Sequence, residues 1–197
     1  MSSASTVRPF LLPQGELSAR KLAELALLIV LGIAVLTLSA KLNIPMWPIP
    51  FTMQTFAVLV LGAAYGSRLG LASVAGYIGL GAMGLPFFAM GGGLIYLTMP
   101  TGGYLIGFLP AVYIAGLMSE KGLDRRFASA IAGFALAHAL IFVFGLAWLT
   151  RFINFTEALS VGLYPFIPSA IIKFSAATGV MLLLWRLKKE SMLRRPR

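Results

Sequence analysis

The chain has 197 residues, of which 59% are hydrophobic and only 11% are charged, and its net charge is +10. Soluble domains carry about a quarter charged residues, so this composition excludes an ordinary soluble protein and predicts an integral membrane protein. The absence of cysteine excludes disulfides, thiol catalysis and cysteine metal sites.

The apolar segments predict an all-α, polytopic membrane protein with about six spans of roughly 20 residues each. We expect a single membrane domain over residues 1–197, with a cytoplasmic tail at 1–20, a six-helix bundle at 22–185 and a basic cytoplasmic tail at 186–197. The predicted spans lie at about 22–42, 52–65 and 69–85, then from 100–104 to about 118, and at about 127–148 and 168–185.

Between the first two spans, Pro45, Pro48 and Pro50 surround Trp47. Proline fixes its own φ, lacks an N–H and disfavours a helical residue before it, so this stretch cannot be helical. Trp47 is either an interfacial anchor or part of a stiff lid over a site, and the prolines on both sides favour the lid.

Two further irregular connections are predicted, a glycine-rich loop at 86–93 and a loop at 150–163. With both termini cytoplasmic, thirteen of the 16 lysines and arginines fall on the inner side, which satisfies the positive-inside rule. The basic residues therefore indicate membrane topology and not nucleic-acid binding. All three irregular loops then share the outer face, where they predict the mouth of a binding site.

Enzymatic chemistry is not indicated by this sequence. There is no Gly-x-x-x-x-Gly-Lys-Ser/Thr stretch for nucleotide binding, so any use of ATP must come from partner subunits. The six acidic residues are scattered and only one histidine is present, which provides neither a carboxylate pair nor a metal site. We expect no enzyme activity, no cofactor and no metal.

Lys173 is the most informative charged residue. Pro168 suits the first turn of a helix, which places Lys173 roughly 7 Å below the helix start. A lysine at that depth is costly unless it is paired or hydrated. We expect it to bind an anionic or strongly hydrogen-bonding group of a ligand, and the alternative is a side chain that extends to the lipid headgroups.

Other polar and aromatic side chains leave more than one interpretation open. His138, in the fifth span, is expected to be a hydrogen-bonded packing residue, with ligand contact as the alternative. Tyr77 and Tyr104 fit core packing and ligand contact equally well. At the other end of the bundle, Ala19, Ala23 and Ala26 form a small-residue stripe that permits close approach of another helix, so a partner-docking role is possible but not decided.

Several motifs, taken in order, resemble the BioY family, the biotin-specific S components of energy-coupling factor (ECF) vitamin transporters. These are Pro48-Ile-Pro-Phe-Thr-Met-Gln-Thr55, Gly84-Leu-Pro-Phe-Phe-Ala89 with Gly91-Gly92-Gly93, Pro100-Thr-Gly-Gly-Tyr-Leu105, Gly145-Leu-Ala-Trp-Leu149, and Pro165-Phe-Ile-Pro168 with Lys173. The resemblance implies a six-helix bundle that holds one biotin in its outer half. It also implies coupling to a transmembrane T subunit, through the alanine stripe, and to two ATPase subunits.

With this resemblance we expect the ligand to contact ten residues: Trp47, Thr52, Gln54, Tyr77, Phe87, Gly91, Gly92, Thr101, Tyr104 and Lys173. The aromatic rings suit the fused rings of biotin, and the hydroxyl, amide and ammonium groups suit its polar edges. The chain departs from the family pattern at Ala170, because members commonly carry an aspartate three residues before the lysine. Either another polar group, such as Gln54 or a carbonyl of the glycine loop, replaces it, or the ligand is a relative of biotin.

The main hypothesis is a biotin-binding, substrate-capture subunit of a vitamin importer, located in the bacterial cell (inner) membrane as a multi-pass protein. Its expected partners are biotin, the lipid bilayer, and the T and ATPase subunits. The alternatives are an S component for another small vitamin or a biotin precursor, and a stand-alone facilitator.

Overall fold

The structure of the protein is a computed structural model that describes residues 18–193, with side chains through residue 190. Its longer helices are α1 Ala19–Lys41, α2 Gln54–Tyr65, α3 Ser67–Ala82, α5 Gly102–Glu120, α6 Phe127–Leu149 and α8 Ile167–Leu193. The shorter elements are β1 Asn43–Ile44, β2 Phe51–Thr52, α4 Leu94–Thr98, η1 Leu123–Arg125, α7 Phe155–Gly162 and η2 Tyr164–Phe166.

Each predicted span corresponds to one of the longer helices, within a few residues at each end. The main difference lies at the C-terminus, where α8 continues to Leu193. Residues 186–193 are therefore helical and are not a separate tail. The remainder of the two predicted tails, 1–17 and 194–197, lies outside the described residues.

Four helical stretches of the described chain are long and apolar enough to cross a membrane: Ala19–Lys41, Gly102–Glu120, Phe127–Leu149 and Phe155–Glu190. They identify an integral membrane protein. At 1.5 Å per residue, the 12 residues of α2 and the 16 residues of α3 extend only about 18 Å and 24 Å. Six complete spans are therefore not established by helix length.

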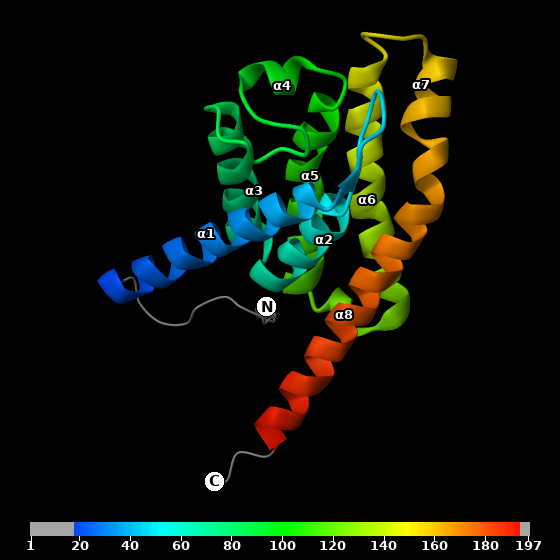
Figure 1. Ribbon diagram of the computed structural model, residues 1–197. Helices are drawn as coiled ribbons and strands as arrows, with labels where there is room; N and C mark the ends of the chain where they lie inside the picture. The colour runs from blue at the N-terminus through cyan, green and yellow to red at the C-terminus, as the bar shows by residue number, and fades with distance from the viewer. Residues whose placement is uncertain (1–17, 194–197) are drawn as a thin grey trace, which may run out of the picture.

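Helix α5 occupies the centre of the bundle and packs against α2, α3 and α6 (Figure 1). At Gly116 the backbone of α5 approaches the turn between α2 and α3 so closely that an added Cβ would meet the backbone of Gly66 and Ser67. The Glu120 carboxylate accepts hydrogen bonds from the Ser67 backbone N–H and hydroxyl, both at 2.8 Å. These contacts fix the N-terminus of α3 against α5.

The proline-rich connection forms a short antiparallel hairpin. Asn43 pairs with Thr52 and Ile44 with Phe51, and the prolines lie in the tip between the two strands. The hairpin leads directly into α2, so Thr52 and Gln54 are placed at the start of that helix. The predicted loop is thus non-helical, as expected, but it contains a strand pair that the sequence did not reveal.

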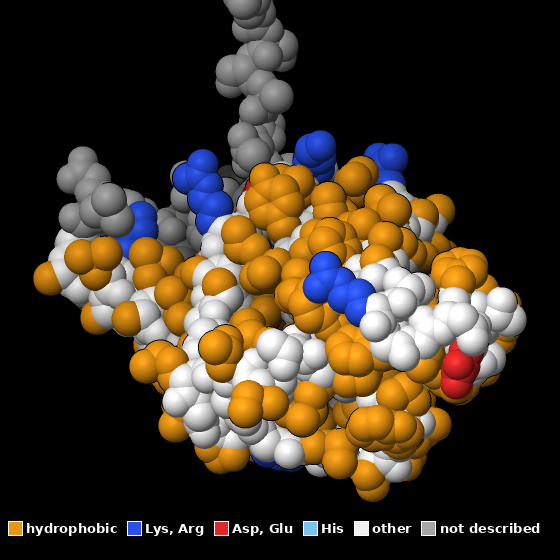
Figure 2. All heavy atoms as spheres, turned by 90° about the horizontal axis from the view of Figure 1, so that it is seen from above, with side chains coloured by type: hydrophobic (Ala, Val, Ile, Leu, Met, Phe, Trp, Pro, Cys, Tyr) orange, Lys and Arg blue, Asp and Glu red, His pale blue; other side chains and the backbone are white. Residues whose placement is uncertain are grey.

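The hairpin, α4 and α7 all lie at one end of the bundle, at the top of Figure 1. Seen from this end, the surface consists mainly of hydrophobic side chains and backbone, with few charged groups (Figure 2). The prediction that the three irregular connections share one end is therefore confirmed. The structure also has two short helices that the sequence did not indicate: α4 directly follows the glycine-rich loop, and α7 lies within the 150–163 connection.

At the opposite end, a polar cluster joins the α5–α6 connection to α8. Asp124 is fully buried, and its Oδ2 accepts hydrogen bonds from the Ser119 hydroxyl at 2.9 Å and from the Trp185 indole N–H at 2.7 Å. The Arg125 guanidinium lies 4.1 Å from the centroid of the Trp185 ring. Burial raises the pKa of the Asp124 carboxyl.

Candidate ligand-binding site

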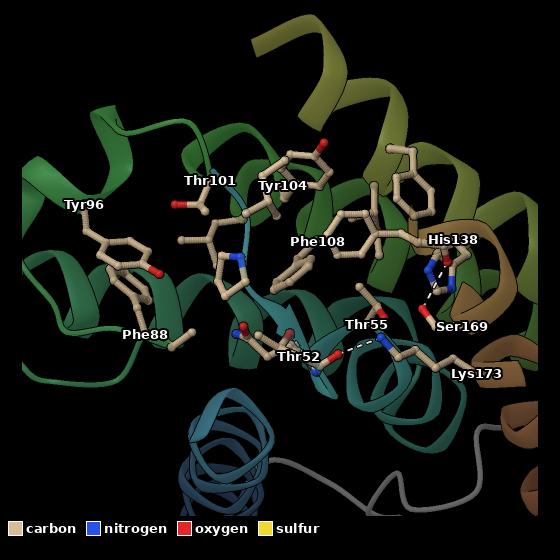
Figure 3. Close-up of a pocket in the computed structure, with 18 residues that line it drawn as sticks. Thr52, Thr55, Phe88, Tyr96, Thr101, Tyr104, Phe108, His138, Ser169 and Lys173 are labelled. Carbon is tan, nitrogen blue, oxygen red and sulfur yellow. Dashed lines mark hydrogen bonds between the residues drawn. The ribbon is translucent and has the colours of Figure 1, made fainter. Parts of the chain in front are cut away.

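A cavity lies beneath the hairpin, between helices α2, α5, α6 and α8 (Figure 3). Five of the ten predicted ligand residues line it: Thr52, Gln54, Thr101, Tyr104 and Lys173. They come from the hairpin, α2, the start of α5, and α8. The fold therefore brings together, at one site, polar side chains that are separated by as many as 121 residues.

Lys173 is the charged residue of the cavity lining. Only 6% of it is exposed, and its ammonium donates a hydrogen bond to the Thr52 carbonyl oxygen at 2.7 Å. The ammonium also lies 4.3 Å from the centroid of the Phe51 ring. Because this side chain is buried and directed toward the hairpin, the alternative that it extends to the headgroups is wrong. Among the described residues, no carboxylate forms a salt bridge with it.

Tyr77 and Phe87 lie behind the cavity wall and do not line it. The Gln54 amide donates to the Tyr77 hydroxyl oxygen at 2.7 Å, and that hydroxyl donates to the Phe87 carbonyl at 3.1 Å. The Tyr77 and Phe87 rings are also stacked, with centroids 6.4 Å apart. This arrangement orients Gln54, whereas Phe88 provides the aromatic surface at this side of the cavity.

Trp47, Gly91 and Gly92 line a second, outer groove. The groove shares Pro50, Tyr96 and Thr101 with the cavity, so the two spaces adjoin. The cavity measures about 60 Å³ and the groove about 510 Å³. A Cβ at Gly92 would clash with the Leu85 carbonyl, which explains the need for glycine there. Trp47 is 86% exposed at the rim of this groove.

The structure adds site residues that sequence reasoning did not select. Thr55, Phe88, Tyr96, His138 and Ser169 all line the cavity. For His138 the expected packing role is only part of the outcome: its ring stacks on Phe142, with centroids 5.4 Å apart, but it also forms part of the cavity wall. A signal for Thr55 was present in the polar run that begins α2, whereas nothing in the sequence distinguishes Phe88 from Phe87.

The three alanines of the predicted docking stripe, Ala19, Ala23 and Ala26, are all exposed on α1. Leu25, Leu28 and Ile29 are partly buried and pack against the core. At 100° per residue, Leu28 lies on the opposite side of the helix from the alanines, and Leu25 and Ile29 lie at the flank between them. The stripe therefore faces away from the bundle and is accessible to another helix.

The cavity is equipped for non-covalent binding. Its lining combines one buried ammonium, several hydroxyl, amide and imidazole groups, and the aromatic rings of Phe88, Tyr96 and Tyr104. It contains no acidic residue, and the described chain has no cluster of metal-ligating side chains. Such a lining suits a small molecule with a flat apolar body and polar ends.

The sequence profile of the BioY family matches residues 12–190, which is most of the chain. The chain belongs to the BioY family. Its relatives include the probable biotin transporter BioY of Pyrococcus horikoshii, 37% identical over 79% of this chain and 91% of the relative. The biotin transporter BioY of Thermotoga maritima is 38% identical over 80% of this chain and 93% of the relative.

A solved structure has the same fold as this chain. The crystal structure of the S-component for biotin from an ECF-type ABC transporter superposes with a TM-score of 0.77. The match covers 88% of this chain and 95% of that chain, at 22% sequence identity. The two proteins therefore share their fold. The named relatives are transporters, and the chain belongs to the same family.

Proposed function

We propose that this protein is the biotin-binding, substrate-capture subunit of a vitamin uptake transporter. The observation that carries the proposal is the position of the five predicted residues, which converge on one cavity with a buried ammonium in its wall. The chain is also 37–38% identical to proteins named as biotin transporters or probable biotin transporters. The cofactor expectation follows from this role, since the ligand is transported and not chemically altered, and ATP acts only through partner subunits.

The shape of the site supports a ligand with a compact head and an extended tail. The cavity is smaller than the groove that adjoins it. A fused-ring head therefore fits between Tyr104, Phe142 and Lys173 with some widening of the walls, and the tail extends past Phe88 and Tyr96 into the groove beside Trp47. Closure of the hairpin over the tail would bring Trp47 into contact with the ligand.

Ala170 is buried next to Ser169. With alanine in place of the aspartate implied by the family resemblance, Lys173 has the Thr52 carbonyl as its acceptor. A carbonyl lacks the full charge of a carboxylate, so a polar group of the ligand competes for the ammonium more easily. This favours retention of biotin binding despite the substitution at position 170.

The remaining features of the proposal concern assembly and topology. The exposed alanine stripe on α1 docks a transmembrane T subunit, which two ATPase subunits energise. The distribution of basic residues supports cytoplasmic termini in the cell membrane, specifically the bacterial inner membrane, with α2 and α3 completing a six-helix bundle. The cavity then opens to the outer side.

Titration calorimetry of the purified protein with biotin tests the proposed ligand. We expect saturable binding with one site per chain, and no binding of riboflavin or thiamine under the same conditions. No heat of binding at micromolar biotin would overturn the proposal, and co-purification of a different vitamin would favour the other S-component assignment. Biotin uptake by vesicles that contain this protein alone would favour a stand-alone facilitator.

A further inference from the structure

Two polar atoms in the cavity wall have no hydrogen-bond partner in the described part of the protein. They are the Thr55 hydroxyl oxygen and the His138 Nδ1, and both are fully buried. The one other such atom among the described residues is a carboxylate oxygen of Asp124, at the opposite end of the bundle. Buried polar groups are nearly always hydrogen-bonded, so two unpartnered atoms in one cavity indicate a missing binding partner.

The local structure explains why the protein does not satisfy them. A helical threonine usually bonds the carbonyl four residues earlier, but Phe51 lies in β2 and not in the helix. The Thr52 carbonyl accepts from Lys173 instead. The His138 ring is held between Phe142 and Phe174, with centroid distances of 5.4 Å and 6.3 Å. Neither ring offers a hydrogen-bond acceptor or donor to the imidazole.

We infer that Thr55 and His138 form a hydrogen-bonding pair for the amide-like edge of the ligand, which in biotin is the ureido group. The hydroxyl of Thr55 donates to the ureido carbonyl oxygen, and the neutral imidazole of His138 accepts from a ureido N–H through Nδ1. This inference rests on the proposed function and assigns one end of the ligand to one end of the site.

The placement of the pair supports this orientation. His138, Ser169 and Lys173 lie at one end of the cavity, whereas Tyr96 and Thr101 lie at the other end, with Thr55 between them on the hairpin side (Figure 3). The outer groove begins at the Tyr96 end. The compact ring system therefore occupies the inner end, and the carboxylated tail points toward the groove.

The test compares two ligands on three variants of the full-length protein. Thr55→Val replaces the hydroxyl with a methyl group, and His138→Phe keeps a flat ring between Phe142 and Phe174. The matched control is Thr178→Val, which changes a fully buried threonine of α8 that bonds the Phe174 carbonyl outside the cavity lining. Affinities for biotin and for biotin methyl ester, which retains the ureido group but lacks the carboxylate, are measured by calorimetry.

We expect Thr55→Val and His138→Phe each to weaken biotin binding by about tenfold or more, because an unmatched ligand hydrogen bond is left in a buried site. The same loss should occur with the ester, and Thr178→Val should bind both ligands normally. If His138→Phe does not fold, Thr55→Val carries the test.

Two results would overturn the inference while leaving biotin binding by the unmodified protein intact. One is an affinity for biotin within about twofold of that of the unmodified protein for both Thr55→Val and His138→Phe, since loss of a ligand hydrogen bond should lower the affinity about tenfold. The other is a loss seen with biotin but absent with the ester, which would assign the pair to the carboxylate. Failure of the unmodified protein to bind biotin would instead contradict the proposed function.

Discussion

Two lysines at the site end of the molecule terminate on backbone carbonyls. Lys173 bonds the Thr52 carbonyl at 2.7 Å, and Lys41, at the end of α1, bonds the Phe88 carbonyl at 2.7 Å. Each ammonium thereby attaches a loop of the site to a long helix. A carbonyl acceptor stabilises the charge less than a carboxylate does, so the Lys173 bond can be exchanged for a ligand group at modest cost.

We expect Lys173→Ala to weaken biotin binding by about tenfold to a hundredfold, because hydrogen bonds to charged groups contribute roughly 1.5–3 kcal/mol. Calorimetry on the purified variant measures the change. Lys121→Ala is the control, since Lys121 is exposed at the end of α5, far from the cavity lining. An affinity equal to that of the unmodified protein would assign Lys173 a role in loop attachment alone.

At this scale the sequence reveals which residues are unusual but not which atoms they contact. The depth of Lys173 follows from the position of Pro168, and the structure agrees. Its acceptor lies 121 residues away, and no local pattern encodes such a pairing. Likewise a single histidine in an apolar helix does not reveal whether its face meets a neighbouring helix or a cavity, which is why the role of His138 was incompletely predicted.

Helix contacts in the bundle depend on positions without a side chain. One such position is Gly116, where α5 passes over the turn between α2 and α3. Gly79 in α3 provides a contrast, because it is exposed and nothing lies within 4 Å of an added Cβ. Substitution of alanine at both positions therefore distinguishes the effect of close packing on stability from the effect of helix propensity.

Gly116→Ala should destabilise the protein by about 1–3 kcal/mol, because the new methyl group overlaps the backbone of Gly66 and Ser67. Gly79→Ala should leave stability unchanged or raise it by up to about 1 kcal/mol, since alanine is the better helix former. Thermal unfolding in neutral detergent compares the two variants. Equal shifts would contradict the close approach at Gly116.

The Asp124 cluster should make stability depend on pH. Burial raises the pKa of Asp124 in the folded protein above its usual value, so between the unfolded and folded pKa values the folded state holds the proton more strongly. The free energy of unfolding should therefore fall as pH rises through that acidic window and stay level above it. Asp124→Asn removes the titrating group and keeps an acceptor for the Trp185 N–H.

Unfolding midpoints of the unmodified protein and of Asp124→Asn are measured from the ordinary carboxyl pKa of about 4 upward. The difference in unfolding midpoint between the unmodified protein and Asp124→Asn should change with pH only in the acidic range, between the unfolded and folded pKa values of Asp124. Ser129→Ala, at the start of α6, controls for general effects of substitution near this connection. Parallel curves for all three proteins would contradict the raised pKa.

The long apolar helices were predictable because about twenty consecutive apolar residues have no other stable arrangement in lipid. The short elements were not. Strands β1 and β2 have two residues each, too few for any alternation to show. Helix α7 begins after Asn154, whose side chain accepts a hydrogen bond from the Glu157 backbone N–H. This capping pair lies within the predicted loop, where one cap alone does not indicate a helix of eight residues.

The whole molecule has a packed centre and two projecting helices. Helix α1 and the C-terminal half of α8 extend away from the bundle, as Figure 1 shows. In the most apolar 18-residue stretch of α1, only 22% is buried inside the protein. Exposed residues on α1 include Val30 and Leu38 besides the alanine stripe. A helix with so much uncovered apolar surface is available for contact with lipid or with another membrane subunit.

We expect Ala23→Trp to abolish co-purification of this protein with the proposed T and ATPase subunits, because a large ring on the stripe prevents close helix approach. Biotin binding by the isolated variant should be unchanged, since Ala23 lies outside the cavity lining. Leu31→Trp is the matched control: Leu31 is 48% exposed on the same helix but lies about a third of a turn from the stripe. Equal effects of both changes would contradict docking through the alanines.

The shortness of α3, which is partly exposed whereas α2 is largely buried, has a consequence for the surrounding lipid. Helices shorter than the hydrocarbon layer are accommodated by local thinning of the bilayer, which costs a fraction of a kcal/mol per ångström. Acyl chain length should therefore change the stability of the protein: nanodiscs of dimyristoyl phosphatidylcholine should give a higher unfolding temperature than nanodiscs of dioleoyl phosphatidylcholine. In a cell membrane of mixed lipids, the same mismatch would enrich shorter chains around this face of the protein.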